Sequence, residues 1–218
     1  MCKFRDLRAD EIECRVQSVK QKGLILLLYK DARVDMNILD ETVGSARWQR
    51  EHYECKGNLF CRVGIVCETK KGESIFPEWI WKSDCGTESN TEAQKGEASD
   101  SFKRACFNWG IGRELYTAPF IWITEDKCKI ENGKCFDKFV VQSIKIENKQ
   151  ITGLTVYNES KKCVAFTYGD DEPKAYTPPT IKCADCGKAV APSMAERTKK
   201  AFGVELCREC GIKRSEQK

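Results

Sequence analysis

Four cysteines near the end of the sequence have the spacing of metal ligands. Two residues separate Cys183 from Cys186, and after twenty more residues Cys207 and Cys210 repeat the same spacing. A glycine follows each pair, which suits a tight knuckle that turns two thiolates toward one ion. Four thiolates complete the tetrahedral site that zinc prefers and leave no open position for catalysis. We expect one structural Zn²⁺ per chain, with a redox pair, chance spacing or bound iron as the alternatives.

A basic pair, Lys103-Arg104, lies within a stretch patterned as an amphipathic helix from residue 91 to residue 109. Apolar residues recur there at helical spacing on one face, and Gly110 and Gly112 end the pattern. Cations at the edge of a helix that is anchored in a core can grip a phosphate backbone. On spacing alone, however, such a pair more often belongs to a solvated helix face than to a ligand site.

The segments around this helix indicate an α+β fold. We expect strands at 12–20 and 24–30, a helix at 31–43, and an antiparallel β-meander at 48–55, 58–69 and 73–82 packed on a central helix. Phe102 is expected in the core rather than as a stacking platform. One face of a strand is expected to carry Cys61, Val63, Ile65 and Cys67, which alternate with polar or small residues. Most of the ten cysteines before residue 180 are interpreted as small core residues.

Later segments indicate further domains. Residues 139–147, 150–158 and 163–168 are rich in β-branched and aromatic residues and predict a small sheet. Residues 169–180 contain acidic residues and three prolines, which is typical of a linker. We therefore expect a core at 1–125, a small β extension at 126–168, the linker at 169–180 and the zinc module at 181–218.

Charge and composition narrow the function. The chain has 37 basic and 33 acidic residues, and 28 of each lie before residue 181, so a nucleic-acid site there must be a local patch. A P-loop motif is missing, the one histidine is His52, and the carboxylates have no nuclease-like spacing, so we expect no enzyme. The first residues lack a secretory signal and no apolar run is long enough to span a membrane, which favours a cytoplasmic protein without membrane contact.

Several motifs together resemble a known family. Residues 97–105 read EASDSFKRA, residues 109–113 read WGIGR, and Leu115-Tyr116 follow. Upstream, residues 12–17 read IECRVQ, residues 29–33 read YKDAR, and Asn37 to Asp40 precede Gly44 and Trp48. In this order, over roughly residues 5–120, they resemble the phage single-strand annealing proteins of the Rad52/Rad22 type (Sak-like). Cys14 departs from the pattern, because an aromatic residue is usual there.

The resemblance implies ATP-independent binding and annealing of single-stranded DNA in phage or prophage recombination and repair, inside a bacterial host cell. It also implies a homo-oligomeric ring or helical filament with the strand in a positive groove. By resemblance, Lys103, Arg104 and Arg15 are the phosphate ligands. Tyr29, Lys30, Arg33 and Lys95 are further candidates, with Tyr29 equally placed in the core. A phage or host exonuclease or single-strand-binding protein is a further candidate partner.

Other classes of function remain open from the sequence. The first is a zinc-ribbon nucleic-acid-binding protein, in which the N-terminal domain only oligomerises. The second is a recruitment protein that binds a host or phage partner through residues 181–218, and the third is a nuclease. The basic segment 194–202 within the zinc module fits either a solubilising surface or a second contact with nucleic acid.

Overall fold

The computed structural model describes residues 3–71, 74–87, 93–169 and 181–216. The chain divides into two compact units, Met1–Lys174 and Ala175–Lys218. Most of the expected linker and the predicted first residues of the 91–109 helix lie outside the described residues. Within the described ranges, no helix is both long and apolar enough to cross a membrane.

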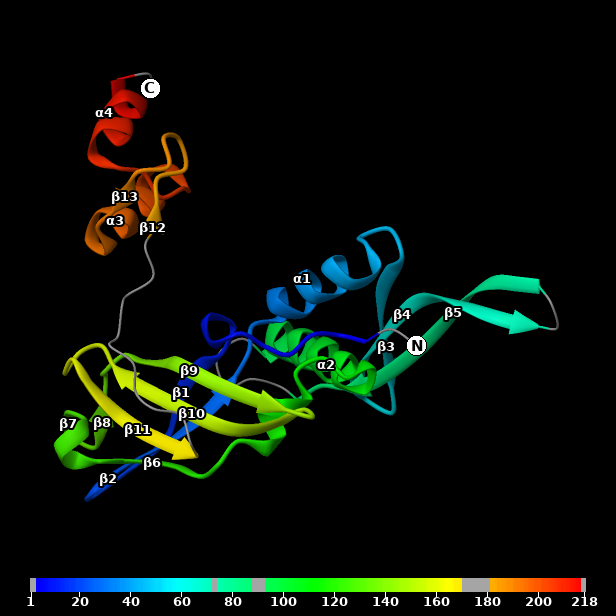
Figure 1. Cartoon of the computed structure of the whole chain (residues 1–218), viewed down its shortest axis with the longest axis horizontal. Helices are drawn as coiled ribbons and strands as arrows, with labels where there is room; N and C mark the ends of the chain where they lie inside the picture. The colour runs from blue at the N-terminus through cyan, green and yellow to red at the C-terminus, as the bar shows by residue number, and fades with distance from the viewer. Residues whose placement is uncertain (1–2, 72–73, 88–92, 170–180, 217–218) are drawn as a thin grey trace. The chain divides into compact units, whose positions relative to one another are not determined.

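Within the described residues, the first unit contains two larger antiparallel sheets, a two-stranded hairpin and two α-helices (Figure 1). A six-stranded sheet has the order β11-β10-β9-β1-β2-β6 and a three-stranded sheet the order β3-β4-β5. The bounds are β1 Glu13–Lys20, β2 Gly23–Tyr29, α1 Ala32–Val43, β3 Trp48–Cys55, β4 Asn58–Lys71, β5 Ser74–Cys85, α2 Ala93–Trp109 and β6 Ile121–Thr124. Strands β9 Phe139–Glu147, β10 Gln150–Asn158 and β11 Cys163–Gly169 follow a small hairpin of β7 Ile130–Glu131 and β8 Lys134–Cys135.

The expected meander is confirmed as the sheet β3-β4-β5, which is paired in register from Trp48 opposite Ile65. Helix α2 lies against it, where Trp109 Nε1 donates a hydrogen bond of 3.0 Å to the Val63 carbonyl and Lys82 Nζ donates one of 2.8 Å to the Asn108 carbonyl. The strand face expected for β4 is confirmed at Cys61, Val63 and Ile65, which are buried, whereas Cys67 at its end is half-buried. A six-stranded sheet accompanies this meander, and the central position of the helix stays a prediction.

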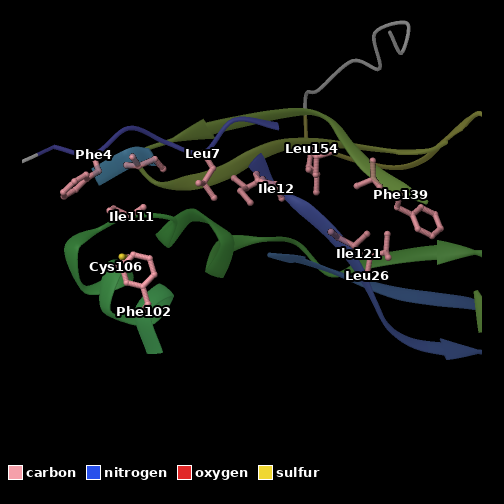
Figure 2. Packing of buried hydrophobic residues seen from close by; sticks show 14 of the residues in the cluster. Phe4, Leu7, Ile12, Leu26, Phe102, Cys106, Ile111, Ile121, Phe139 and Leu154 are labelled. Carbon is pink, nitrogen blue, oxygen red and sulfur yellow. The ribbon is translucent and has the colours of Figure 1, made fainter. Parts of the chain in front are cut away.

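The strands expected as a separate small sheet join the larger one. Strand β9 pairs with β1 through Glu13 and Val140, and β10 and β11 continue outward from β9. The reason is packing: Val141, Leu154 and Val156 are buried in the same hydrophobic cluster as Leu26 of β2. Figure 2 follows this cluster from Phe102 and Cys106 on α2 to Leu26, Ile121 and Leu154 on the sheet.

Cysteines contribute less to the core than the composition predicts. Before residue 180, Cys61, Cys106 and Cys128 are buried among the described cysteines, five others are half-buried and Cys55 is exposed. The expectation for Phe102 is confirmed, since its side chain is fully buried. Of the half-buried cysteines, Cys14, Cys67 and Cys135 pack against the hydrophobic cluster, where a thiol serves as a small apolar side chain.

The N-terminal segment is fastened to the sheet by charged side chains. Glu114 is buried in the 3₁₀ helix Arg113–Thr117, and its Oε1 accepts a 2.7 Å hydrogen bond from the Leu7 amide. Lys149, between β9 and β10, donates to the Phe4 and Arg5 carbonyls at 3.3 and 3.2 Å. Residues 4–7 are thereby held over the core that Phe4 and Leu7 help to build.

Two glycines turn the chain from α2 into the 3₁₀ helix, and they differ in their surroundings. Both Gly110 and Gly112 have positive φ angles, of 97° and 72°. A Cβ atom at Gly110 would meet nothing within 4 Å, whereas one at Gly112 would overlap Lys30 Cε. The Lys30 side chain cannot move aside easily, because its ammonium is bound to Asp35 in the interior.

We therefore predict that Gly112→Ala destabilises the protein more than Gly110→Ala. Both variants carry the cost of a positive φ, roughly 1–2 kcal/mol, and Gly112→Ala adds about 1–3 kcal/mol of overpacking. Urea unfolding of the two variants, followed by circular dichroism, measures the difference. Equal midpoints would contradict the proposed clash with Lys30.

Candidate nucleic-acid interface and metal centre

A pocket forms where the end of β2, helix α2 and the 3₁₀ helix Arg113–Thr117 meet. It has a volume of about 270 Å³. Leu28 and Tyr29 line it from β2, Lys103 and Phe107 from α2, and Leu115 and Tyr116 from the 3₁₀ helix, with Asp100 and Lys30 completing the wall. Two motifs that lie more than sixty positions apart in the sequence, the 29–33 turn and the helix signature that begins at residue 97, thus meet at one site.

Lys103 is the cation of α2 that faces this pocket. Its charge acts on the acidic groups around it. Arg33 first, and Lys103 more weakly, hold the pKa of Asp31 below its usual range. Asp31 caps α1 by accepting a hydrogen bond from the Arg33 amide, so Lys103 lies close to the start of that helix.

Arg15 approaches the same site from β1. In the β1–β2 register Arg15 lies opposite Leu27, and its guanidinium carbon is 5.9 Å from the centroid of the Tyr29 ring. The Tyr29 hydroxyl is hydrogen-bonded to Glu13, which is the main reason why the pKa of Tyr29 is raised to about 12. Tyr29 is half-buried, lines the pocket together with Lys103, and has the Arg15 guanidinium against its ring.

The other cations predicted for this site lie farther out. Arg104, next to Lys103 in sequence, turns toward β5, where its Nε is 3.3 Å from Asp84 Oδ1. Arg33 has an 81% exposed side chain and pairs with Asp31 at 2.9 Å. Lys95 is exposed in the first turn of α2 and does not line the pocket. Of the candidates, Tyr29 and Lys103 therefore line the pocket and Arg15 contacts Tyr29, whereas Arg104, Arg33 and Lys95 do not line it.

Lys30 was expected to contact DNA, but the structure places its side chain in the interior. Its side chain is 1% exposed, and its ammonium binds both carboxylate oxygens of Asp35, which is fully buried. The ammonium also lies 4.7 Å from the centroid of the Phe107 ring. Burial raises the pKa of Asp35 to about 6, against the opposing pull of Lys30. Lys30 is thus a neutralised cation beneath the pocket, out of reach of a phosphate at the surface.

Three residues of this site were not predicted from the sequence, namely Asp35, Phe107 and Tyr116. A signal for Asp35 is present, because it shares a helical face with Ile38 and Leu39, three and four residues later, and a carboxylate on an apolar face needs a buried partner. Phe107 and Tyr116 make an edge-to-face ring pair with centroids 4.9 Å apart. Tyr116 belongs to the matched signature, but spacing gives no indication that the two rings meet.

The second unit brings together the four cysteines that the sequence singles out. The Sγ atoms of Cys183, Cys186, Cys207 and Cys210 all lie within 4.8 Å of one another. Those of Cys186 and Cys207 are 3.7 Å apart. Four sulfurs at about 2.3 Å from a tetrahedral zinc would be about 3.8 Å apart, so the cluster has the right size for such an ion.

The knuckles that present these thiols are backbone turns. The amides of Gly187 and Gly211 donate to the carbonyls of Cys183 and Cys207, both at 2.9 Å. Backbone amides, that of Cys207 first, lower the pKa of the Cys183 thiol to about 6. The neighbouring Cys207 thiol is the main reason why the pKa of Cys210 is raised to about 12. Four thiolates repel one another strongly, so full ionisation requires a cation among them. The cluster can therefore hold a metal ion.

Comparison with known proteins identifies the first unit. Residues 4–133 match the family model described as Rad52/22 family double-strand break repair protein. Neither a search of curated proteins nor a search of solved structures found a match. The matched range covers more than half of the chain and includes Arg15, the 29–33 turn and the whole of α2. This chain therefore belongs to the Rad52/22 family of double-strand break repair proteins.

Proposed function

We propose that this protein binds single-stranded DNA and anneals complementary strands without ATP. The observation that carries the proposal is the pocket that Tyr29 and Lys103 line together, with the Arg15 guanidinium 5.9 Å from the centroid of the Tyr29 ring. Family membership implies DNA binding and self-assembly. The absence of a P-loop motif from the sequence supports annealing over an ATP-driven recombinase. The Sak-like resemblance supports a place in phage or prophage recombination.

Annealing requires a strand held by its backbone, so that its bases remain free to pair. Cations that contact phosphates provide affinity without sequence preference, and that affinity falls as salt rises. Lys103 and Arg15 are the first-rank phosphate ligands in this proposal. Arg104 can join them by leaving Asp84, and the exposed Arg33 and Lys95 extend the path of the strand.

Self-assembly would turn this local site into a continuous track. The paired ends of β4 and β5 project away from α2 (Figure 1). On β5 they expose Ile75, Phe76, Trp79 and Ile80, of which Ile75 is 63% exposed. Apolar side chains grouped on an exposed arm are typical of a surface that another chain covers. We propose that this arm contacts the next subunit in a ring or helical filament.

We propose that the four-cysteine cluster holds one structural Zn²⁺. Four thiolates saturate a tetrahedral ion, so this site would stabilise the fold without catalysing a reaction. The second unit has few buried hydrophobic residues among those described, namely Cys183, Val190, Ala195 and Leu206. With so small a core, metal binding would supply much of its folding free energy.

Annealing of two labelled complementary oligonucleotides without ATP tests the main proposal. We expect Lys103→Ala with Arg104→Ala to slow annealing about a hundredfold, because two charge-assisted contacts contribute roughly 1.5 kcal/mol each. The salt dependence should weaken as well. The matched control is Lys129→Ala with Lys134→Ala, which removes the same charge from the exposed β7–β8 hairpin. Unchanged annealing by a folded, oligomeric Lys103/Arg104 variant would refute the site.

A chain that ends at residue 180 belongs in the same assay. Annealing by this shortened protein would place the activity in the first unit. Loss of annealing on truncation, with the Lys103/Arg104 variant still active, would favour the zinc-ribbon alternative, in which residues 181–218 bind the nucleic acid.

The buried pair gives a separate prediction. Lys30→Met alone should lower the free energy of unfolding by about 3–5 kcal/mol, since it leaves Asp35 buried without its cation. Lys30→Met combined with Asp35→Leu should restore most of that loss. If Lys30 supports the fold and does not contact phosphate, the refolded double variant binds DNA normally in a fluorescence anisotropy titration. A stable double variant with lost binding would return Lys30 to the list of DNA ligands.

Metal analysis tests the zinc proposal. The purified protein should contain one zinc ion per chain, and a chelator should make residues 175–218 sensitive to protease while residues 1–174 resist. Cys207→Ser should lose the ion, whereas Cys163→Ser, a half-buried cysteine in β11, should keep it. Iron in place of zinc, or a Cys207→Ser protein with full metal content, would contradict the assignment.

A further inference from the structure

The pocket beside Lys103 is more apolar and more aromatic than phosphate binding requires. Three aromatic rings line it, those of Tyr29, Phe107 and Tyr116. Phe107 and Tyr116 meet edge to face at an interplanar angle of 65°. Phosphate ligands need cations and hydrogen-bond donors, so this aromatic lining suits a different part of the ligand.

The rings are fixed at different depths. Phe107 is half-buried above the Lys30 ammonium, which lies 4.7 Å from its centroid, so a paired charge holds it from below. Tyr116 is 69% exposed and stands at the rim of the pocket. Tyr29 is half-buried, with the Arg15 guanidinium carbon 5.9 Å from its ring centroid. A flat ligand could therefore enter past Tyr116 and rest against Phe107 without a rearrangement of the core.

Charge complementarity and size indicate which ligand fits. Two lysines lie in the pocket wall, Lys103 and Lys30, and Asp35 neutralises the charge of Lys30. The Asp100 carboxylate in the same wall accepts hydrogen bonds from Thr87, and Arg15 lies beside the Tyr29 ring. A flat aromatic group whose two flanking groups are anionic would satisfy both features. At about 270 Å³ the pocket is near the lower end of the volumes of small-molecule sites, roughly 300–1,000 Å³. A single nucleotide unit of a DNA strand matches this description.

We propose that each subunit takes one nucleobase of the bound single strand into this pocket, where it stacks on Tyr116 and Phe107. Lys103 and Arg15 hold the phosphates on either side of that nucleotide. The inference rests on the proposed single-strand binding and adds a base-binding subsite to it. Stacking on aromatic side chains depends little on base identity, so the subsite provides affinity and a fixed repeat along the strand without sequence preference.

The subsite also gives annealing a release step. The bases outside the pocket stay free to test an incoming strand. A base held in the pocket must leave before it can pair, and pairing with a complementary strand competes with stacking on Tyr116. Correctly matched strands would therefore free themselves from the protein as the duplex extends.

Two oligonucleotides of equal length and charge test the proposal: a thymine homopolymer and an abasic strand with the same sugar-phosphate backbone. Fluorescence anisotropy at fixed salt measures the affinity of the full-length, metal-loaded protein for each. We expect the wild type to bind the thymine strand at least about tenfold more tightly, since stacking contributes roughly 1–3 kcal/mol per base. Tyr116→Ala should bring the ratio of the two affinities close to one, and the affinity for the abasic strand should not change. Lys103→Ala should weaken both strands by the same factor.

Two controls accompany these variants. Tyr116→Phe keeps the ring and should keep the ratio. Phe136→Ala removes an aromatic side chain that is 83% exposed and does not line the pocket, and should change neither affinity. Thermal unfolding and size-exclusion chromatography check that Tyr116→Ala is folded and assembled.

The outcomes separate this inference from the proposed function. Equal wild-type affinity for both strands, with both weakened by Lys103→Ala, would overturn the base subsite and leave strand binding intact. Failure to bind either strand would overturn both proposals. Loss of the oligomer in Tyr116→Ala would overturn the subsite as well, because the pocket would then receive a side chain of a neighbouring subunit.

Discussion

The buried ion pair of Lys30 and Asp35 is the constraint on which the arrangement around the pocket depends. Lys30 follows β2, Asp35 lies in α1, Phe107 of α2 covers the ammonium, and the missing side chain of Gly112 leaves room for the lysine stem. A buried charge that loses its partner is strongly destabilising, so these four segments can shift only together. The relative positions of Tyr29, Lys103 and Tyr116 are fixed from beneath by a contact that never reaches the surface.

This arrangement also explains how a domain without net charge can bind a polyanion. Glu13, Asp31 and Asp84 each contact a side chain of the proposed interface. These carboxylates reduce the long-range attraction between the protein and the DNA phosphates. They also hold the Tyr29 ring and the side chains of Arg33 and Arg104 in defined positions. Affinity would then depend on close geometry and on repetition of the site through the oligomer, and less on a broad positive field.

Much of the fold could be predicted from the sequence, because its signals are local. The alternation of Cys61, Val63 and Ile65 gives β4, and the two knuckle spacings give the cysteine cluster. The candidate site was partly predictable, since the resemblance pointed to Lys103, Arg15 and Tyr29. The partner of Lys30 could not be predicted, because a lysine can bind either a phosphate or a buried carboxylate. Only the burial of its side chain in the fold decides between the two. The joining of β9 to β1 was equally hidden, since strand pairing across more than a hundred residues leaves no local pattern.

Strands β9, β10 and β11 show that the end of the family match and the end of the folded unit are different positions in this chain. The family model ends at residue 133, yet the sheet that contains β1 and β2 is completed by strands from residues 139–169. Without them, β1 would present an unpaired edge, and the cluster around Leu26 would lose Val141, Leu154 and Val156. The stretch shared with the family is therefore shorter than the unit that folds. In this chain, residues beyond the matched range supply three of the six strands of that sheet.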